Sequence, residues 1–328
     1  MSSLSPVRIR AAIPASAAEA ASTAAPQGFG ATDAGLVLMA TIWGVNYSVV
    51  KAGLQAMTPL SFTGVRMVFA SVVLFGIASF VRAEWPNRRD IVRLLLLGLL
   101  GNGFYQLLFI SGMARTRAGV AALIVAAGPA WIAILSRLLG RERVSCLGWA
   151  GIGLQLIGVL CVVGSTQKFD GGSDGLLGAV LIATGSIAWA LYSILLQPYT
   201  QRSNGLHLSA LTLASGAAMM GVIGIPDMLR LDWGAVGLTG WGAVAYSALL
   251  AMVVAYLLFY RGVRILGPTK TAMYGNLQPI IAIAVAWILL HETPTGWQLL
   301  GAACIMGGLL VSRTAKVRPA PEALEEAA

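Results

Sequence analysis

The chain has 328 residues, of which 57% are apolar and only 11% are charged, and its mean hydropathy is +0.79. A soluble domain of this length needs many more charged residues to cover its surface, so the composition excludes the soluble globular class and indicates an integral membrane protein. The net charge of +9 does not indicate a nucleic-acid partner, because the basic residues lie between long apolar runs, where membrane topology accounts for them.

Ten apolar runs have about the 20 residues that a bilayer-spanning helix needs. The connections between them are too short for a sizeable soluble domain. We therefore expect an all-α integral membrane protein with ten transmembrane helices, at residues 32–53, 59–81, 91–112, 118–138, 145–164, 174–197, 207–225, 234–259, 268–290 and 296–312.

The two ends of the chain are polar or small-residue segments. Residues 1–31 are rich in Ala and Ser and lack the apolar core of a signal peptide, and residues 314–328 are similarly polar. Both are expected to be disordered cytoplasmic tails.

Five of the predicted helices carry aromatic, amide and hydroxyl side chains at helical spacing, so that each set shares one face. Amides avoid lipid and seek partners inside a bundle, so these faces are expected to line a substrate cavity. The expected lining residues are Trp43, Asn46 and Tyr47; Asn102, Tyr105 and Gln106; Trp189 and Ser193; Tyr256 and Tyr260; and Tyr274 and Gln278. Asn276 is added to them because it lies in the polar stretch 275–279, which is expected to form a cavity wall or hinge. Interfacial anchoring is the alternative for Tyr and Trp near helix ends.

Arg66 lies about two turns into the second predicted helix, where a bare charge is costly. With Lys51 at the end of the first helix, it suits a carboxylate-bearing solute that also has an apolar part. The alternative is a structural pairing of Arg66 with carbonyls or with Glu292. No Asp or Glu lies deep in a predicted span, which argues against a standard carboxylate proton relay, although Glu142, His291 and Glu292 at helix ends could exchange protons.

The sequence repeats itself with a shift of 150 residues. The spacing P-x12-E-x8-G-x6-G starts at Pro129 in the first half and at Pro279 in the second, and it brings Glu142 and Glu292 into register. The predicted repeats are residues 32–164 and 174–313. Because each holds five helices, an odd number, the second must be inverted relative to the first, an arrangement that transporters use for alternating access.

The two matching prolines interrupt the fourth and ninth predicted helices. Proline removes one backbone hydrogen bond, and non-helical backbone at membrane depth is tolerated where protein or a water-filled cavity receives it. Pro129 and Pro279 are therefore expected to mark hinges or cavity walls, with simple packing kinks as the alternative.

The basic residues set the orientation by the positive-inside rule. With the N-terminus in the cytoplasm, sixteen of the 22 basic residues lie on the cytoplasmic side, five lie outside, and Arg66 lies within a span. Both termini are therefore expected in the cytoplasm.

Catalysis finds no support in the sequence. There is no phosphate-binding loop, no nucleophile motif and no metal-spaced His/Cys set, and the three cysteines are scattered among apolar helices. We expect no enzyme activity, no metal and no cofactor.

Four segments carry a resemblance to a known family: "WGVNYSVVK", "SFTGVRMVFA" with Arg66, "GPAWIAILSRLLGRERVSCLGWAGIGLQLIGV" and "QPIIAIAVAWILLHETPTGWQLLGAACIMGG". Together they resemble the EamA-type family of the drug/metabolite transporter superfamily, over residues 32–313. The resemblance implies two five-helix repeats and export of small metabolites, amino acids above all and in some members aromatic ones, across the bacterial inner membrane. The second half has Ala214 or a neighbour where the first has Arg66.

Other functions remain open at this point. Superfamily members that move sugar phosphates or nucleotide sugars would be expected to have more buried Lys and Arg, and the cationic-drug branch usually has a buried Glu that this chain lacks. A non-transporting scaffold or a lipid flippase is the alternative from another class. The expected partners are a small solute and the lipid bilayer; the oligomeric state is not predicted.

Overall fold

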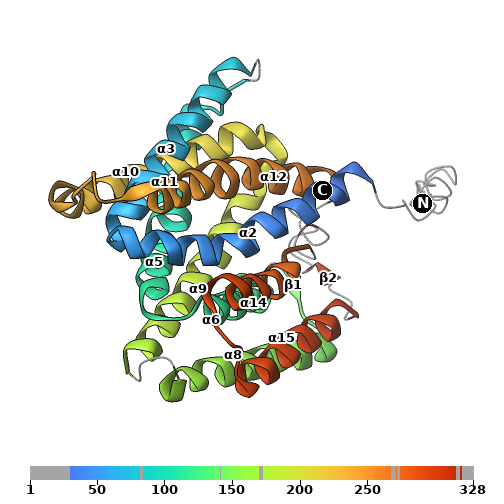
Figure 1. The fold of residues 1–328 in the computed structure, drawn as a ribbon. Coiled ribbons are helices and arrows are strands. Elements are labelled where there is room, and N and C mark those ends of the chain that lie inside the picture. The colour runs from blue at the N-terminus through green and yellow to red at the C-terminus, as the bar shows by residue number, and fades with distance from the viewer. Residues whose placement is uncertain are drawn as a thin grey trace, which may run out of the picture.

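The computed structural model describes residues 30–81, 84–140, 142–169, 173–266, 271, 274–314 and 318–319. Within these residues the protein is helical, apart from a ladder in which β1 (Glu142–Arg143) pairs antiparallel with β2 (Arg318–Pro319) (Figure 1). Eight helical stretches are long and apolar enough to cross a membrane, and two apolar helices are shorter. The chain is thus a multi-pass membrane protein by length and composition of its helices.

The first half contains the helices α2 (Ala31–Ala56), α3 (Pro59–Phe80), α4 (Arg88–Gly98), η1 (Leu99–Phe104), α5 (Tyr105–Arg115), α6 (Ala118–Ala126), α7 (Gly128–Leu138) and α8 (Cys146–Phe169). The second half contains α9 (Ser173–Arg202), α10 (Gly205–Arg230), α11 (Gly237–Ala245), η2 (Tyr246–Val254), α12 (Ala255–Leu266), α14 (Leu277–Leu290) and α15 (Gly296–Thr314). The elements α4, η1 and α5 form one stretch, as do α11, η2 and α12.

Several helices begin at residues that satisfy the free N–H groups of a first turn. Thr58 caps α3 by accepting from the Ser61 N–H at 3.3 Å, and Pro59 occupies the first helical position, where its missing N–H costs nothing. Asn87 caps α4 in the same way, accepting from the Asp90 N–H at 2.8 Å. These local signals separate the helices with short connections.

Four predicted spans end at least five residues before their helices do. α8 ends at Phe169 rather than at residue 164, and α12 ends at Leu266 rather than at residue 259. The sixth span was expected to stop at residue 197 and the seventh at 225, but α9 continues through Pro198 to Arg202 and α10 through Pro226 to Arg230. Each proline lies four residues before the end of its helix. Its missing N–H leaves the carbonyl four residues earlier without its intrahelical partner, and only one more turn follows before the helix ends.

The two ends of the chain are only partly described. Residues 1–29, 315–317 and 320–328 of the predicted tails lie outside the described residues. Residues Arg318–Pro319 are not free of structure as expected, because they form β2 against β1. The polar composition of this tail did not predict that its backbone would form hydrogen bonds with another segment.

The stretches that contain η1 and η2 have π-helical turns, which the hydrophobic pattern did not reveal. The two segments end at Phe104 and Val254, which are 150 positions apart, the same shift that aligns the two halves of the sequence. Short π-helical segments inside α-helices are rare and often lie at functional sites. Here they rotate the side chains that follow relative to a regular α-helix.

α8 and α15 lie against each other at closely packed glycines, as Figure 1 also shows. A Cβ atom at Gly151 would lie 2.6 Å from the carbonyl oxygen of Gly308, and one at Gly158 would lie 2.7 Å from that of Gly301. The pairing makes the two helices antiparallel. It also follows the repeat, since Gly151 corresponds to Gly301 and Gly158 to Gly308.

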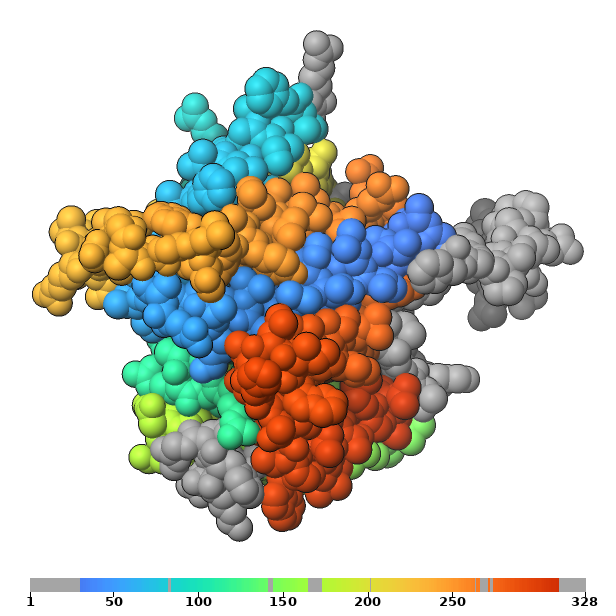
Figure 2. Space-filling view, viewed as in Figure 1, coloured from blue at the N-terminus to red at the C-terminus, as the bar shows by residue number. Residues whose placement is uncertain are grey.

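The arrangement of the other helices is seen most easily from α2. Figure 2 shows α14 and α15 (orange to red) below α2 (blue), and Gly44 of α2 lies against α14, where a Cβ would be 2.8 Å from Ile281. On the other side of the bundle, α3 packs on α10, with Gly64 against the backbone of Met220. The bundle therefore brings elements of both halves together along its length.

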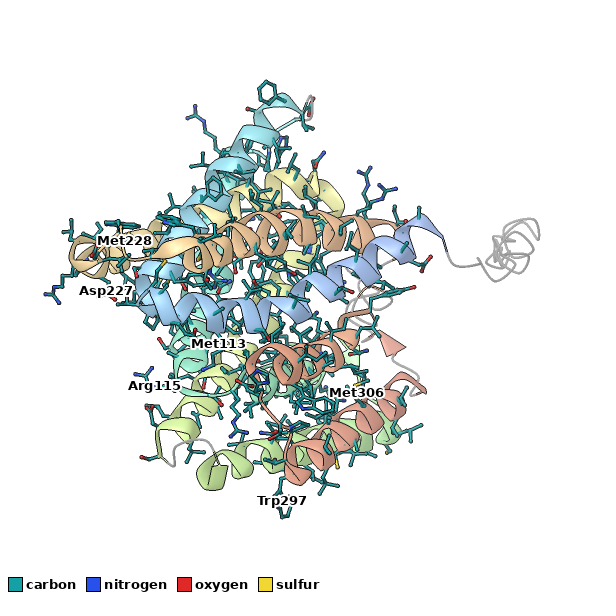
Figure 3. The ribbon with its side chains drawn as sticks, in the orientation of Figure 1. Met113, Arg115, Asp227, Met228, Trp297 and Met306 are labelled. Carbon is teal, nitrogen blue, oxygen red and sulfur yellow. The ribbon has the colours of Figure 1, made fainter. Side chains whose placement is uncertain are left out.

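Two contacts gather helix ends at one end of the bundle. Thr58, before α3, donates to Asp227 near the end of α10 at 2.7 Å. Arg115, which ends α5, forms a salt bridge of 3.2 Å with Asp174 at the start of α9. Figure 3 shows Arg115 and Asp227 at this same end, which also includes Lys51 on the last turns of α2. We call it the Lys51 end.

Candidate functional site

A cluster of aromatic rings joins both halves in the interior. Trp43 of α2 contacts Tyr256 of α12, with ring centroids 5.8 Å apart. Tyr256 contacts Trp189 of α9 at 6.3 Å, and Trp189 contacts Tyr105 of α5 at 5.2 Å. These four predicted lining residues, from four elements, thus form one continuous set of rings.

The same cluster extends toward the Lys51 end through Phe109. Its ring centroid lies 5.7 Å from that of Tyr105 and 5.9 Å from that of Tyr47. Tyr47 is one helical turn from Lys51 on α2. The aromatic set therefore reaches from the middle of the bundle to within a turn or two of its surface.

Arg66 is buried beside this cluster, with only 1% of its surface exposed. Its Nη2 donates to Oε1 of Gln106 at 3.0 Å, and its guanidinium carbon lies 5.2 Å from the centroid of the Phe62 ring. In the described part of the chain no carboxylate lies within salt-bridge distance of it, and its Nε has no hydrogen-bond partner. A buried cation with free donor capacity is costly unless an anion completes it.

Glu292 is not a partner of Arg66, although it was one of the two structural partners that the alternative interpretation named. Its carboxylate instead accepts hydrogen bonds from the backbone N–H groups of Ala118 at 3.3 Å and Gly119 at 3.4 Å, in the first turn of α6. Burial raises the pKa of Glu292, whereas these two hydrogen bonds and the charges of Lys51 and Arg117 lower it; the net shift is upward. Glu292 thus links the loop after α14 to the start of α6.

Two of the predicted amides bond across the halves. Oδ1 of Asn102 accepts from the Tyr256 hydroxyl at 3.3 Å, and Oδ1 of Asn46 accepts from the Ser247 hydroxyl at 2.7 Å. Trp43 also donates from Nε1 to the carbonyl of Ala251 at 2.9 Å. Both Ser247 and Ala251 belong to η2, so the π-helical segment supplies the acceptor and donor groups that hold the polar face of α2.

Tyr260 is buried on α12 and lies one turn beyond Tyr256. Its hydroxyl lies 3.4 Å from that of Tyr192, and Tyr192 also donates to Thr212 at 3.3 Å. Sequence reasoning did not select Tyr192 or Thr212. The signal for Tyr192 was its position three residues after Trp189, on the same helix face.

The structure also places four further predicted lining residues. Ser193 donates to the Trp189 carbonyl of its own helix at 2.7 Å. Tyr274 donates to Asp33 in the first turn of α2, at the end of the bundle opposite Lys51. Asn276 is buried before the first turn of α14, and Gln278 lies beside Gly275.

The paired prolines lie in the first turns of half-helices. The fourth helix breaks at Ala127, between α6 and α7, and Pro129 follows in the first turn of α7. The ninth breaks at Asn276, and Pro279 follows in the first turn of α14. At both breaks the backbone stays close to helical, with φ −80° and ψ 5° at Ala127 and φ −74° and ψ −10° at Asn276. Both prolines occupy first-turn positions, where a missing N–H costs little. The side chain of Glu142, in β1, is not among those described.

A cavity of about 670 Å³ opens at the Lys51 end. It is lined by residues of the last turns of α2 and α5, the start of α3 and the end of α14 and its loop: Lys51, Ala52, Leu54, Gln55, Pro59, Ala114, Leu289, Leu290 and Glu292. A helix rises 1.5 Å per residue, so Arg66 lies roughly 10 Å deeper along α3 than Pro59, and Tyr47 about 6 Å deeper along α2 than Lys51. The cavity therefore lies above the Arg66 region.

No group of three or more His, Cys, Asp or Glu side chains that could hold a metal ion occurs within the described residues. The chemistry available to the site is therefore that of a guanidinium, amides and aromatic rings, which suits recognition of a solute.

The sequence matches the model of the EamA-like transporter family twice, at residues 31–164 and 176–314. An uncharacterized transporter of Bacillus subtilis, YdfC, is 26% identical over 83% of this chain and 87% of its own length. A Salmonella typhimurium protein named as a probable amino-acid metabolite efflux pump is 27% identical over 86% of this chain and 96% of its own length. The Escherichia coli inner membrane transporter YedA, also uncharacterized, is 28% identical over 77% of this chain and 80% of its own length.

The fold also has a counterpart among solved structures. One crystal structure superposes with a TM-score of 0.61 at 20% sequence identity, covering 85% of this chain and 96% of that one. At this identity the likeness concerns the fold.

Proposed function

Since the chain belongs to the EamA-like transporter family, we propose that it exports small carboxylate-bearing metabolites, with amino acids that have apolar or aromatic side chains as the favoured class. The observation that carries the proposal is Arg66. It is a buried cation with a free donor, next to a continuous set of aromatic rings. The printed name of the Salmonella relative is consistent with the same class of solute.

The physical fit is between a forked donor and a carboxylate. A guanidinium offers donors in a plane that match the two oxygens of a carboxylate, and charge-assisted hydrogen bonds are worth about 1.5–3 kcal/mol. Gln106 occupies one donor of Arg66 and Phe62 lies over its face, which leaves Nε and the remaining amino hydrogens for a ligand. The rings of Tyr105, Tyr47 and their neighbours would then contact an apolar side chain.

We propose that transport proceeds by alternating access between two inverted repeats of five transmembrane helices each. The double match to the family model, the antiparallel glycine contacts of α8 and α15 and the π-helical segments at repeat-equivalent positions support this arrangement. The half-helix breaks before Pro129 and Pro279 supply the candidate hinges. The charge bias favours both termini in the cytoplasm of a bacterium, with the Lys51 end outside.

The experiment is counterflow in proteoliposomes loaded with unlabelled amino acids, with labelled free amino acids and their amides compared outside. We expect free acids to be carried and amides to be carried poorly. Arg66→Lys, which keeps the charge but loses the fork, should lower the rate, and Arg66→Gln should remove most of it.

If amides are carried as well as free acids, with the same dependence on Arg66, the residue is structural and carboxylate recognition fails. If no labelled solute enters, the amino-acid proposal fails, and a scaffold or lipid-handling role takes its place.

A further inference from the structure

The cavity at the Lys51 end is separate from the Arg66 region and carries a different charge pattern. Lys51 lines it from α2 and Glu292 lines it from the loop after α14, so that a cation and an acid face the same space. Between them the walls are apolar, with Leu54 from α2 and Leu289 and Leu290 from α14. Arg66, by contrast, presents positive charge with no acid nearby in the described residues.

Glu292 keeps acceptor capacity on the cavity side. Each of its two oxygens accepts one backbone N–H from the start of α6, at 3.3 and 3.4 Å, and a carboxylate has about four lone-pair sites. These two bonds fix the orientation of the carboxylate without using all its sites. Burial raises the pKa of Glu292, and the nearby cations Lys51 and Arg117 offset part of that rise.

From this geometry we infer that the cavity is a second substrate site, which binds the zwitterionic end of an amino acid through both of its charges. The carboxylate of the ligand lies toward Lys51, its ammonium toward Glu292, and its side chain against Leu54, Leu289 and Leu290. The inference rests on the proposed export of amino acids and adds to it a requirement for a free ammonium group as well as a free carboxylate.

The position of the cavity gives the site its place in transport. It lies one to two helical turns above Tyr47 and Arg66, on the side that the charge bias assigns to the cell exterior. A carboxylate that leaves Arg66 therefore meets a second cation, Lys51, before it reaches bulk water. At about 670 Å³ the cavity is larger than one amino acid, so ordered water can complete the contacts between the ligand and the cavity walls.

The test measures competition from the outer face alone. Right-side-out membrane vesicles from cells that express the full chain are loaded with labelled leucine, and its efflux is followed while unlabelled leucine, leucine amide or N-acetyl-leucine is added outside. Vesicles from cells without the protein are subtracted. The quantity compared is the external concentration that halves efflux.

We expect leucine to compete best in the parent protein. Lys51→Met should raise the half-inhibiting concentration of leucine about tenfold, a change typical of a lost charge-assisted hydrogen bond, and should abolish the preference for leucine over its amide. Glu292→Gln, which keeps an oxygen for the α6 N–H groups, should abolish the preference for leucine over N-acetyl-leucine. Arg230→Gln is the control, because it removes a positive charge at the end of α10, outside the cavity. It should leave the half-inhibiting concentration of leucine and both preferences unchanged.

Two results separate the possible failures. If efflux persists and both cavity variants keep the parental concentrations for all three compounds, the cavity is no substrate site and Glu292 only anchors α6. If Glu292→Gln does not fold, Lys51→Met alone tests the site, because Lys51 lies on α2 and makes no part of the contact between Glu292 and α6. If the parent vesicles release no leucine or other labelled amino acid, the proposed function itself fails, and the zwitterion site with it.

Discussion

Arg66 and Gln106 form a buried hydrogen bond of 3.0 Å between α3 and α5. The amide is a neutral acceptor, so it orients the guanidinium without cancelling its charge. A glutamate at the same position would form a charge-neutralised pair, and the site would lose its reason to attract an anion. The choice of an amide over an acid at position 106 is therefore central to the proposed recognition.

This relationship predicts the effect of Gln106→Glu. The new carboxylate should occupy Arg66 permanently and compete with the carboxylate of the substrate, which lowers transport by more than about tenfold. Counterflow in proteoliposomes measures the rate. Gln197→Glu, the same change at an exposed position of α9, is the matched control and should leave the rate near parental. Parental counterflow in Gln106→Glu would contradict an anion-binding role for Arg66.

The paired prolines predict a loss of switching. Replacement of Pro129 or Pro279 by Ala supplies the missing N–H near each half-helix break and should favour one conformation over the other. Counterflow should fall while the amount of folded protein, measured by size-exclusion chromatography, stays near normal. Two Ala variants that both transport at the parental rate would leave the breaks as features of packing alone.

The contact between α8 and α15 predicts a stability effect confined to one face of α8. Gly158→Ala places a Cβ about as close as 2.7 Å to the Gly301 carbonyl oxygen, and such overpacking typically costs about 1–3 kcal/mol. Gly153→Ala, on the same helix with nothing within 4 Å of the new Cβ, should be neutral or slightly stabilising. Thermal unfolding in detergent compares the two variants. Equal melting temperatures would mean that α8 and α15 accommodate the new Cβ at no cost in stability.

The charge bias predicts which faces are accessible to water-soluble reagents. In a variant without Cys146, Cys161 and Cys304, a cysteine at position 293 should react with an impermeant maleimide added to intact cells, whereas one at position 88 should react only after the membrane is permeabilised. The reverse pattern would overturn the orientation. It would also place the cavity at the Lys51 end on the cytoplasmic side.

Glu292 predicts a pH response of the outer cavity. Its pKa is raised by burial, so the carboxylate takes up a proton at a higher pH than an ordinary glutamate, and the neutral acid no longer attracts an ammonium group. Competition by external leucine should therefore weaken as the outside pH falls through that raised pKa. The other charged groups around Glu292 are Lys51, Arg117 and the adjacent His291. His291→Asn should keep the pH dependence of competition by leucine, and Glu292→Gln should lose it. If His291→Asn loses the pH dependence and Glu292→Gln keeps it, Glu292 is not the group responsible.

Much of this architecture is accessible from the sequence because the bilayer constrains it so strongly. Apolar length located the helices, and the amide-bearing stripes identified Asn102 and Gln106, both of which are buried. These features depend on local composition and helical period, which a single sequence contains.

Other features depend on tertiary packing and were missed. The π-helical turns of η1 and η2 arise where neighbouring helices hold the backbone, and no residue type marks them. The stacking of Trp85 on His207, with centroids 4.1 Å apart, joins a connecting segment to a helix start 122 positions later, and only the fold brings them together. Tyr274 was placed in the cavity because of its spacing from Gln278, yet its partner is Asp33.

The glycine contact between α8 and α15 has the reciprocity of a dimer interface. Gly151 meets Gly308 and Gly158 meets Gly301, so exchanging the two halves maps the contact onto itself. Each half therefore carries both complementary surfaces of the seam. On the proposed inverted-repeat arrangement, a fragment of one half would close the same seam with a second copy of itself in the opposite orientation. The covalent link between the halves then fixes their ratio and relative orientation, whereas the fit of the seam comes from the glycines themselves.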